Sequence, residues 1–371
     1  MRKQLGQLRK QVLKVRTSVL TMFVFFCGLP GAWSSTSAPL EVKVVVVTMF
    51  EHGELSGDRL GEFQFWVERF PLEDELSFPL GQHPLRWQDA GVLGLCTGGG
   101  ISNATASVMA LGMDPRFDLS RAYWLIAGIA GGDPEDVTIG SGVWARYVID
   151  GGLAFEIDAR EIPKDWPYGL IPLGATKPAR PDDAVIEGWT VDTVSFALSS
   201  KLAVHAARIS QAVELPDFPA SRAFTAQFDG FQGAKGQPAV VLGETLSAST
   251  YWHGRYLTQW ANDWVKVHSS SDMNFMTSNM EDSGTLTALH RLAREGRVDP
   301  DRVMVLRTVS NFTQPPAGTS AAWSATADYP DDGLPALESA YRMGSAVAKT
   351  IVRDWSAYRD GLPDANRVTN D

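Results

Sequence analysis

The sequence predicts an α/β fold built on one central mixed sheet. Val42–Thr48 is a continuous, mostly β-branched run, the pattern of a strand that is buried on both faces of a parallel or mixed sheet. Two further apolar runs, Val92–Cys96 and Arg121–Ala127, both end in glycine-rich turns, and the first turn leads into a helical segment of small residues. Asp58–Phe70 has helical spacing and is predicted to cover the sheet.

The remaining elements follow in chain order. Val143–Ile149 and Leu153–Ile157 have the pattern of two strands joined in a hairpin through Asp150-Gly151-Gly152. Pro163–Pro181 is rich in Pro, Gly and Trp, which predicts an irregular insertion or a lid. Further strands are predicted at Ala239–Leu242 and Arg302–Val309, and further helices at Thr193–Val213, from Glu281 to about Glu295, and at Pro335–Trp355.

The first 38 residues have the composition of a signal peptide. A basic segment without acidic residues precedes the short apolar run Val19–Cys27, and small residues follow as far as Ala38. The alternative is an uncleaved membrane anchor, although the run is shorter than the roughly 20 residues that a membrane-spanning helix needs. We therefore expect a periplasmic or secreted protein, with residues 39–371 forming a single domain with insertions.

Composition narrows the classes of partner. The formal net charge is -10 and the pI is about 5.2, which argues against nucleic acid or an anionic membrane as partner, because both require a basic face. Beyond the predicted leader, Cys96 is the single cysteine, so no intramolecular disulfide is expected. No later segment is long and apolar enough to span a bilayer. A neutral small molecule remains compatible with this composition.

Polar side chains collect where the predicted strands end, which is where α/β sheets bind ligands. Glu51 follows the first strand, with His52 and Glu54 as alternatives, and the other polar residues at strand ends are Asn103, Glu281, Ser310 and Asn311. Each has a purely structural alternative: Glu281 as a first-turn glutamate, Asn311 as a cap, both asparagines as glycosylation sequons, and Tyr251 and Trp252 as core aromatics. The six histidines show no ligand spacing, so no metal is predicted.

Five short segments give the chain a family resemblance. TGGGISNA, GIAGG, SASTYWHG, TSNMEDSG and LRTVSNF occur in this order, which resembles the purine nucleoside permease family. Members of that family are in turn similar to the nucleoside phosphorylase and nucleosidase superfamily. The resemblance covers nearly all of the chain beyond the leader. It implies a three-layer α-β-α, nucleoside phosphorylase-like fold with a central mixed twisted sheet.

The resemblance also implies roles for the residues in these segments. Met280 and Glu281 would hold the ribose, Ser310 and Asn311 would engage N7 of the purine, and Glu51 would activate water. The catalytic candidates are therefore Asn311 and Glu51, and the substrate-binding candidates are Asn279, Met280, Glu281, Ser310, Tyr251, Trp252, Gly99, Asn103 and Gly131. No cofactor is implied.

The implied activity is cleavage of the N-glycosidic bond of a purine nucleoside. Asn311 stands where many relatives have Asp, so hydrogen bonding would replace protonation of N7 at this residue. No arginine cluster resembles a phosphate site, which favours water over phosphate as nucleophile, with phosphate as co-substrate in the alternative. Two other functions stay open: a nucleoside-binding component of an uptake system with a membrane partner, and a relative that has lost activity. Because superfamily relatives often share sites across an interface, we expect a homo-oligomer.

Overall fold

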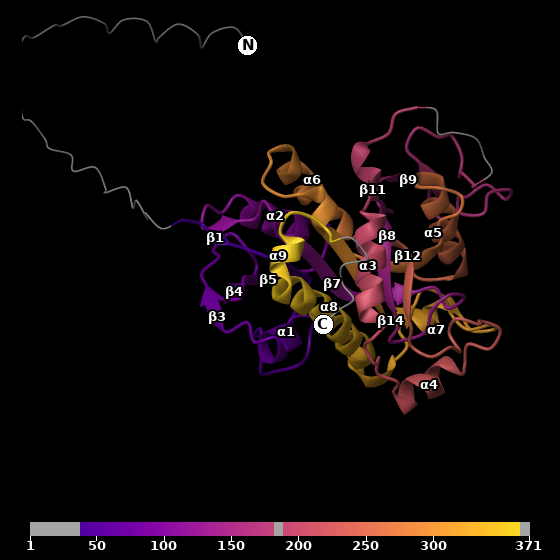
Figure 1. Cartoon of the computed structure of the whole chain (residues 1–371). Helices are drawn as coiled ribbons and strands as arrows, with labels where there is room; N and C mark the ends of the chain where they lie inside the picture. Colours follow the sequence, from indigo (N-terminus) through magenta and orange to yellow (C-terminus); the bar gives the residue numbers. More distant parts are fainter. Residues whose placement is uncertain (1–37, 182–187, 364–371) are drawn as a thin grey trace, which may run out of the picture. The chain divides into compact units, whose positions relative to one another are not determined.

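The computed structural model describes residues 38–181 and 188–363. The predicted signal peptide, apart from its last residue, lies outside the described residues. Pro39–Asp371 forms one compact unit (Figure 1). Within the described ranges, no helix combines the length and the hydropathy that crossing a membrane requires.

A ten-stranded mixed sheet forms the centre of this unit. Strand β2 (Val44–Thr48) lies between the parallel strands β5 (Val92–Cys96) and β7 (Tyr123–Gly132), and all five of its residues are buried. Alternate residues of β2 point into two different hydrophobic clusters, Val44 into one and Val45 into the other. The β-branched run therefore forms a strand covered on both faces, as its sequence predicts.

The second half of the sheet closes on itself. Strand β14 (Val303–Phe312) runs parallel to β7 and antiparallel to β8 (Gly142–Asp150). From β8 the pairing continues through β12 (Val240–Ser247) and β13 (Phe275–Asn279) back to β7. The prediction of a mixed α/β fold around a central sheet is confirmed, but this ring of five strands is not an open layer.

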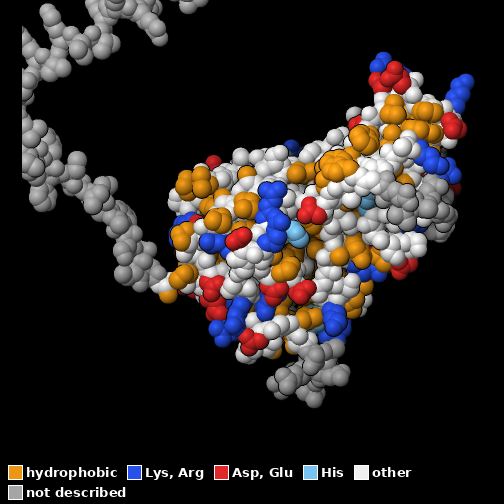
Figure 2. Space-filling model, turned by 90° about the horizontal axis from the view of Figure 1, so that it is seen from above, with side chains coloured by type: hydrophobic (Ala, Val, Ile, Leu, Met, Phe, Trp, Pro, Cys, Tyr) orange, Lys and Arg blue, Asp and Glu red, His pale blue; other side chains and the backbone are white. Residues whose placement is uncertain are grey.

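Helices pack on both faces of the sheet beside β2. One hydrophobic cluster joins Trp66 of α1 and Val347 of α8 to alternate strand residues, and the other joins Val108 of α2 and Leu286 of α6 to the strand residues between them. The helices are α1 (Gln64–Arg69), α2 (Ile101–Gly112), α3 (Ser200–Ser210), α4 (Pro219–Thr225), α5 (Arg255–His268), α6 (Asp282–Arg294), α7 (Ala321–Ala325), α8 (Leu334–Arg353) and α9 (Trp355–Tyr358). On the face drawn in Figure 2, acidic and basic side chains are interspersed.

Four local predictions are wrong. The helix predicted over 193–213 is confined to α3, because residues 195–197 form an edge strand that pairs with β8. The glycine-rich segment predicted as a turn after Ala127 instead continues β7 as far as Gly132. The hairpin over 143–157 does not form, because Asp150 Oδ1 accepts the N–H groups of Gly152 and Leu153 and turns the chain away from β8. Strand β9 (Ala154–Glu156) pairs instead with β10 (Leu170–Pro172). The helix predicted over 58–70 is confined to α1, and the residues before it form a loop. The other short strands are β1 (Leu40–Glu41), β3 (Asp74–Leu76), β4 (Leu85–Gln88), β6 (Phe117–Asp118) and β11 (Ser195–Ala197).

Helices α2 and α6 approach each other closely at Gly284. A Cβ atom added there would lie 2.4 Å from the carbonyl oxygen of Ile101, and Thr105 Oγ1 donates a hydrogen bond to the Gly284 carbonyl. This contact aligns the starts of the two helices, where the backbone N–H of Gly100 donates to Glu281 Oε1 at 3.1 Å. The close contact at Gly284 thus helps to place Glu281, a predicted substrate-binding residue.

We predict that Gly284→Ala lowers the free energy of unfolding by about 1–3 kcal/mol, because the added methyl group must displace backbone. Urea unfolding followed by tryptophan fluorescence measures the change. His290→Ala, on the exposed face of the same helix, is the control and is expected to stay within about 0.5 kcal/mol of wild type. An unchanged midpoint for Gly284→Ala would show that the helices do not meet at this residue.

Candidate functional site

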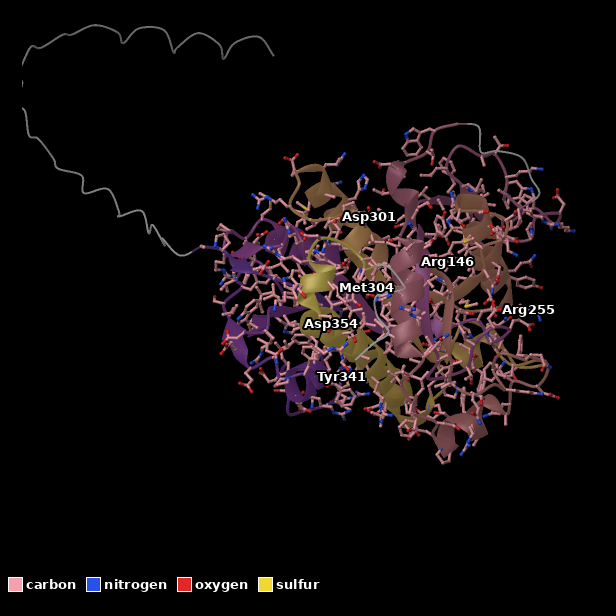
Figure 3. All side chains as sticks on the ribbon, in the orientation of Figure 1. Arg146, Arg255, Asp301, Met304, Tyr341 and Asp354 are labelled. Carbon is pink, nitrogen blue, oxygen red and sulfur yellow. The ribbon has the colours of Figure 1, made fainter. Side chains whose placement is uncertain are left out.

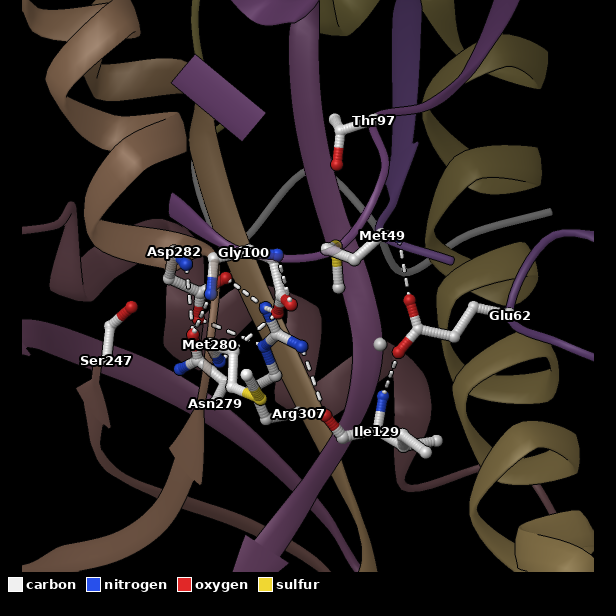
Figure 4. A network of polar contacts seen from close by, with 12 residues as sticks. Met49, Glu62, Thr97, Gly100, Ile129, Ser247, Asn279, Met280, Asp282 and Arg307 are labelled. Carbon is white, nitrogen blue, oxygen red and sulfur yellow. Dashed lines mark hydrogen bonds and ion pairs between the residues drawn. The ribbon is translucent and has the colours of Figure 1, made fainter. Parts of the chain in front are cut away.

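The turn between β13 and α6 is organised by Asn279. Its Oδ1 accepts the backbone N–H groups of Glu281 and Asp282 at 3.1 and 2.9 Å, and its Nδ2 donates to Thr245 Oγ1 at 2.8 Å. An asparagine that accepts the first N–H groups of a helix fixes the direction of the following side chains. Asn279, predicted to bind substrate, therefore orients Glu281 and Asp282 (Figure 4).

Arg307 lies at the centre of a buried charge network. From β14 its Nε donates to Asp282 Oδ2 at 3.0 Å, its Nη2 bonds Asp282 Oδ1, and its Nη1 donates to the carbonyl of Ile129 at 3.0 Å (Figure 4). Glu281 Oε2 lies 3.5 Å from Nη2. The side chains of Arg307 and Asp282 are 1% and 0% exposed. The bidentate geometry fixes how the two groups lie, and removal of either one would leave the other charge buried without a partner.

Glu281 has its two oxygens turned to backbone donors at the edge of this network. Oε1 accepts the N–H of Gly100 and Oε2 accepts the N–H of Met280 at 3.2 Å. Gly100 has φ +87°, a conformation that favours glycine, so the approach of its N–H to Glu281 depends on that residue type. Each carboxylate oxygen keeps a further lone pair for a ligand.

A second glutamate, Glu62, was missed by the sequence prediction. Its carboxylate is buried and accepts the N–H groups of Met49 and Ile129, both at 2.7 Å (Figure 4). Burial raises the pKa of Glu62 to about 8, with the charge of Arg307 opposing and that of Glu281 adding to the rise. A Cβ at Gly128 would lie 2.5 Å from Glu62 Oε1 and 2.8 Å from Arg307 Nη1. Gly128, which lies within β7, therefore makes room for both groups.

The sequence contains one signal for Glu62. It is the acidic residue immediately before an apolar helical segment, the same position that drew attention to Glu281. The more visible glutamate at the strand exit, Glu51, has another structural task. Its Oε2 accepts the N–H groups of Phe63 and Gln64 at 2.9 and 2.7 Å, which caps the start of α1. Burial raises the pKa of Glu51, against the effect of these hydrogen bonds. His52 and Glu54 are exposed.

A second cluster lies at the exit of β14. Asn311 Nδ2 donates to the hydroxyl of Tyr251 at 2.9 Å, and Ser310 Oγ donates to Asn311 Oδ1 at 2.9 Å. The register of β14 against β7 shifts between Val309 and Asn311, an irregularity that changes the direction of these side chains. A Cβ at Gly131 would lie 3.2 Å from Asn311 Nδ2. The predicted residues Gly131, Tyr251, Ser310 and Asn311 are thus brought together.

The remaining predicted residues lie apart from these clusters. Trp252 packs its ring on Trp260 and Phe275, with centroids 5.6 and 5.9 Å apart, so it is part of the core as its structural alternative predicted. Asn103 is exposed and donates to the Gly99 carbonyl at 2.8 Å in the first turn of α2. Met280 is half-buried beside Glu281.

Four arginines near the predicted strand ends were candidates for binding phosphate: Arg116, Arg121, Arg146 and Arg160. Each of them pairs with a carboxylate in the described residues. Arg146, labelled on β8 in Figure 3, pairs with the buried Glu244 at 2.8 Å. The other three, Arg116, Arg121 and Arg160, pair with Asp114, Asp360 and Asp158. Across residues 38–181 and 188–363, no three His, Cys, Asp or Glu side chains are grouped so that they could hold a metal ion.

The fold and the two clusters define an α/β protein with a polar site at the carboxyl ends of its central strands. The chain belongs to the purine nucleoside permease family, whose family model matches residues 41–363. This confirms the family that the five short segments indicated.

Two named relatives illustrate the match. A purine nucleoside permease of Candida albicans is 31% identical over 272 residues, which cover 72% of this chain and 66% of that protein. A probable purine nucleoside permease of Schizosaccharomyces pombe is 28% identical over 269 residues, covering 71% and 76%. The chain thus spans slightly less than two thirds of the length of the Candida relative.

Solved structures with a similar course of the chain include two 5'-methylthioadenosine/S-adenosylhomocysteine nucleosidases. The one from Neisseria meningitidis is 17% identical with a TM-score of 0.47, covering 83% of this chain and 99% of that one. The one from Helicobacter pylori is 13% identical with a TM-score of 0.49, covering 85% and 99%. A futalosine hydrolase of Helicobacter pylori gives 13% and 0.46, covering 82% and 97%.

We predict that Asp282→Ala costs about 3–5 kcal/mol in the free energy of unfolding, because it leaves the Arg307 charge buried with no bidentate partner. The double variant Asp282→Leu with Arg307→Met removes both charges and is expected to be more stable than Asp282→Ala alone. Urea unfolding of the variants measures both effects. If the double variant is no more stable than Asp282→Ala, the loss is one of packing and not of charge pairing.

We also predict a pH dependence of stability that belongs to Glu62. Because its pKa is raised in the folded state to about 8 from 4.5, the folded protein binds the proton more tightly than the unfolded chain does. Its contribution is therefore fully present below about pH 4.5 and is lost as the pH rises towards 8. The difference in unfolding free energy between wild type and Glu62→Gln, measured from pH 5 to 9, should fall with rising pH. A flat difference would show that Glu62 is ionised throughout.

Proposed function

We propose that this protein binds a purine nucleoside at the carboxyl ends of β7, β13 and β14 and hydrolyses its N-glycosidic bond. The observation that supports this most is Glu62, a buried carboxyl group with a pKa of about 8 beside Arg307 and Glu281. A group that exchanges a proton near neutral pH, next to a second carboxylate with free lone pairs, is suited to general base catalysis. Family membership supports the purine nucleoside as ligand.

In this proposal Glu281 binds the ribose. Its two oxygens each accept one backbone N–H, so each can also accept a hydrogen bond from a ribose hydroxyl. Arg307 Nη2 lies 3.5 Å from its Oε2, and Asn279 holds the turn from which Glu281 projects. Met280 would pack against the sugar. Glu281 therefore binds and orients the nucleoside and takes no proton from it.

Glu62, and not Glu51, is proposed to activate the water. Glu51 already caps α1 with hydrogen bonds to Phe63 and Gln64, whereas Glu62 lies with the charge network. Water would attack C1' and give a proton to Glu62 as the bond from C1' to N9 breaks, with its electron pair leaving on the purine. Asn311 Nδ2 donates to the Tyr251 hydroxyl at 2.9 Å and to the Phe312 carbonyl at 3.4 Å. The longer of these two hydrogen bonds would be exchanged for one to N7 of the departing base.

Water is favoured over phosphate as the nucleophile. A phosphate dianion in a protein site is usually held by free cationic side chains or convergent N–H groups. Arg307 is engaged by Asp282 and Ile129, and the two carboxylates of Glu281 and Asp282 exceed its single positive charge. An anion placed there would meet net repulsion.

Three finer statements belong to this proposal. We propose that the fold is of the nucleoside phosphorylase type, that the protein forms a homo-oligomer, and that residues 1–38 direct it to the periplasm or out of the cell. The basic and apolar composition of these residues supports the last statement.

The alternative is a nucleoside-binding component of an uptake system. It is favoured by the names of the relatives, which are called purine nucleoside permeases. In this case the same residues would bind the nucleoside without turnover, and a membrane protein would complete the transport. Glu62 would then have a structural role and would take part in no reaction.

Purified protein incubated with inosine or adenosine, with and without phosphate, is expected to release free base without a phosphate requirement. Glu62→Gln should lower kcat by about 10²–10⁴-fold, the usual contribution of a general base, with little change in affinity. Glu281→Gln should mainly weaken binding. Liquid chromatography of the products and calorimetry measure the two quantities.

Glu51→Gln is the matched control, because it alters a helix cap and not the proposed base. Nucleoside binding without free base in either buffer would favour the uptake component. If Glu51→Gln abolishes turnover and Glu62→Gln does not, the base has been assigned to the wrong glutamate. Absence of both binding and cleavage contradicts the proposal.

A further inference from the structure

A buried carboxylate outside the proposed chemistry lies directly after β7. Asp133 is 2% exposed, and its oxygens accept hydrogen bonds from Asn262 Nδ2 at 2.8 Å, the N–H of Glu135 at 3.1 Å and Gln314 Nε2 at 3.4 Å. These donors are neutral. Burial raises the pKa of Asp133 to about 6, so at neutral pH the group is mainly ionised and acts as an acceptor. It contacts no residue of the proposed ribose or base site.

The two side-chain donors to Asp133 come from different parts of the fold, which Asp133 therefore joins. Asn262 lies on α5, and Gln314 follows the end of β14. Thr258, one helical turn before Asn262 on the same face of α5, bonds Thr313 through the two Oγ1 atoms at 3.0 Å. The N–H of Gly254 donates to the Thr313 carbonyl at 2.8 Å. The start of α5, near Arg255 in Figure 3, is therefore fastened to the exit of β14.

The loop that carries Tyr251 ends at this junction. At one end the N–H of Ala248 donates to the Asn279 carbonyl at 3.0 Å, beside the turn that orients Glu281. At the other end lies Gly254, whose φ of +127° allows the chain to enter α5. Tyr251 lies between these two anchors, with its hydroxyl on Asn311. Its position depends on where α5 is held.

We infer that Asp133 is a positioning residue that holds α5 on the exit of β14 and thereby keeps the Tyr251 hydroxyl on Asn311. Its effect on nucleoside binding rests on the proposed function, whereas its effect on the loop does not. The ligand group concerned is the purine base, because Tyr251 and Asn311 are the residues proposed to meet it. Asp133 acts through these residues and touches no substrate.

The donor pattern explains why a carboxylate is required. Two oxygens serve three donors, so an amide at this position would turn its NH₂ group toward at least one N–H group. Asp133→Asn keeps the shape of the side chain but is expected to break the hydrogen bonding between Asp133 and α5. In the double variant Asp133→Asn with Asn262→Asp, the amide and the carboxylate exchange places and the hydrogen bond between them can form again. The bond from Asn262 Nδ2 to the Thr258 carbonyl is lost in this variant, so the expected recovery is partial. A purely steric role would not be restored by this exchange.

Hydrogen exchange of the ligand-free protein, followed by mass spectrometry on peptides covering 249–262, tests the inference. Asp133→Asn should exchange faster there than wild type, and the double variant should return towards wild type. Asp136→Asn is the matched control, because this carboxylate of the same segment bonds Asn274 and meets α5 only through the charge of Lys266, which lies outside the peptides measured. Unchanged exchange in Asp133→Asn, or a double variant no better than the single one, overturns the inference.

Kinetics with inosine provide the second measurement. Asp133→Asn should raise KM roughly tenfold, about the effect of one lost buried hydrogen bond, with a smaller change in kcat, and the double variant should recover most of the loss. A fall in kcat alone contradicts the inference. If wild type neither binds nor cleaves inosine, the proposed function fails, while the exchange result still decides the role of Asp133.

Discussion

The pairing of Arg307 with Asp282 is the constraint on which the rest of the site depends. Arg307 reaches Asp282 at the start of α6 and the Ile129 carbonyl on β7, so one side chain joins three elements of the fold. Because two buried charges cost much free energy when either is left alone, these elements are not free to separate. Glu281 and Glu62 are placed by the same arrangement. The position of the proposed ribose site is thus a consequence of where one guanidinium is buried.

Four carboxylates near this site differ in what they can do because their partners differ. Asp282 bonds Nε and Nη2 of Arg307 and is structural, whereas Glu281 approaches the same charge at 3.5 Å and keeps lone pairs for a ligand. Glu51 is occupied by the start of α1. Glu62 has only two backbone donors and is the group whose pKa burial raises to about 8. Proton exchange is therefore expected at Glu62, since Asp282 and Glu51 are occupied by structural partners and Glu281 is the group placed to bind a ligand.

The sequence predicts those features that depend on neighbouring residues. The buried strand β2, the glycine turn after β5 and a glutamate before α6 all follow from local pattern, and the family resemblance identified the segments around Tyr251, Glu281 and Asn311. The closure of the sheet could not be predicted, because β14 pairs with both β7 and β8 over long separations in sequence. Glu62 was missed for a related reason: its altered pKa arises from burial against Arg307, which is 245 residues away. Periodicity does not report which distant charge a carboxylate will meet.

Binding and hydrolysis require different things of the two parts of this site, the Asn311 cluster proposed to meet the base and the Arg307 network proposed to meet the sugar. In the proposed reaction negative charge develops on the purine, and Asn311 can stabilise it only by hydrogen bonding, because an amide has no proton to transfer. Tyr251 keeps its proton at neutral pH, since burial raises its pKa to about 12. The base side thus offers less stabilisation than a protonating acid would, and the positive charge on the sugar must be stabilised more strongly. That requirement falls on Glu281, whose carboxylate is held in place by the N–H groups of Gly100 and Met280 and lies 3.5 Å from Arg307. Catalysis by this chain would therefore depend on the buried charge network. Binding of a nucleoside without hydrolysis would depend on that network less.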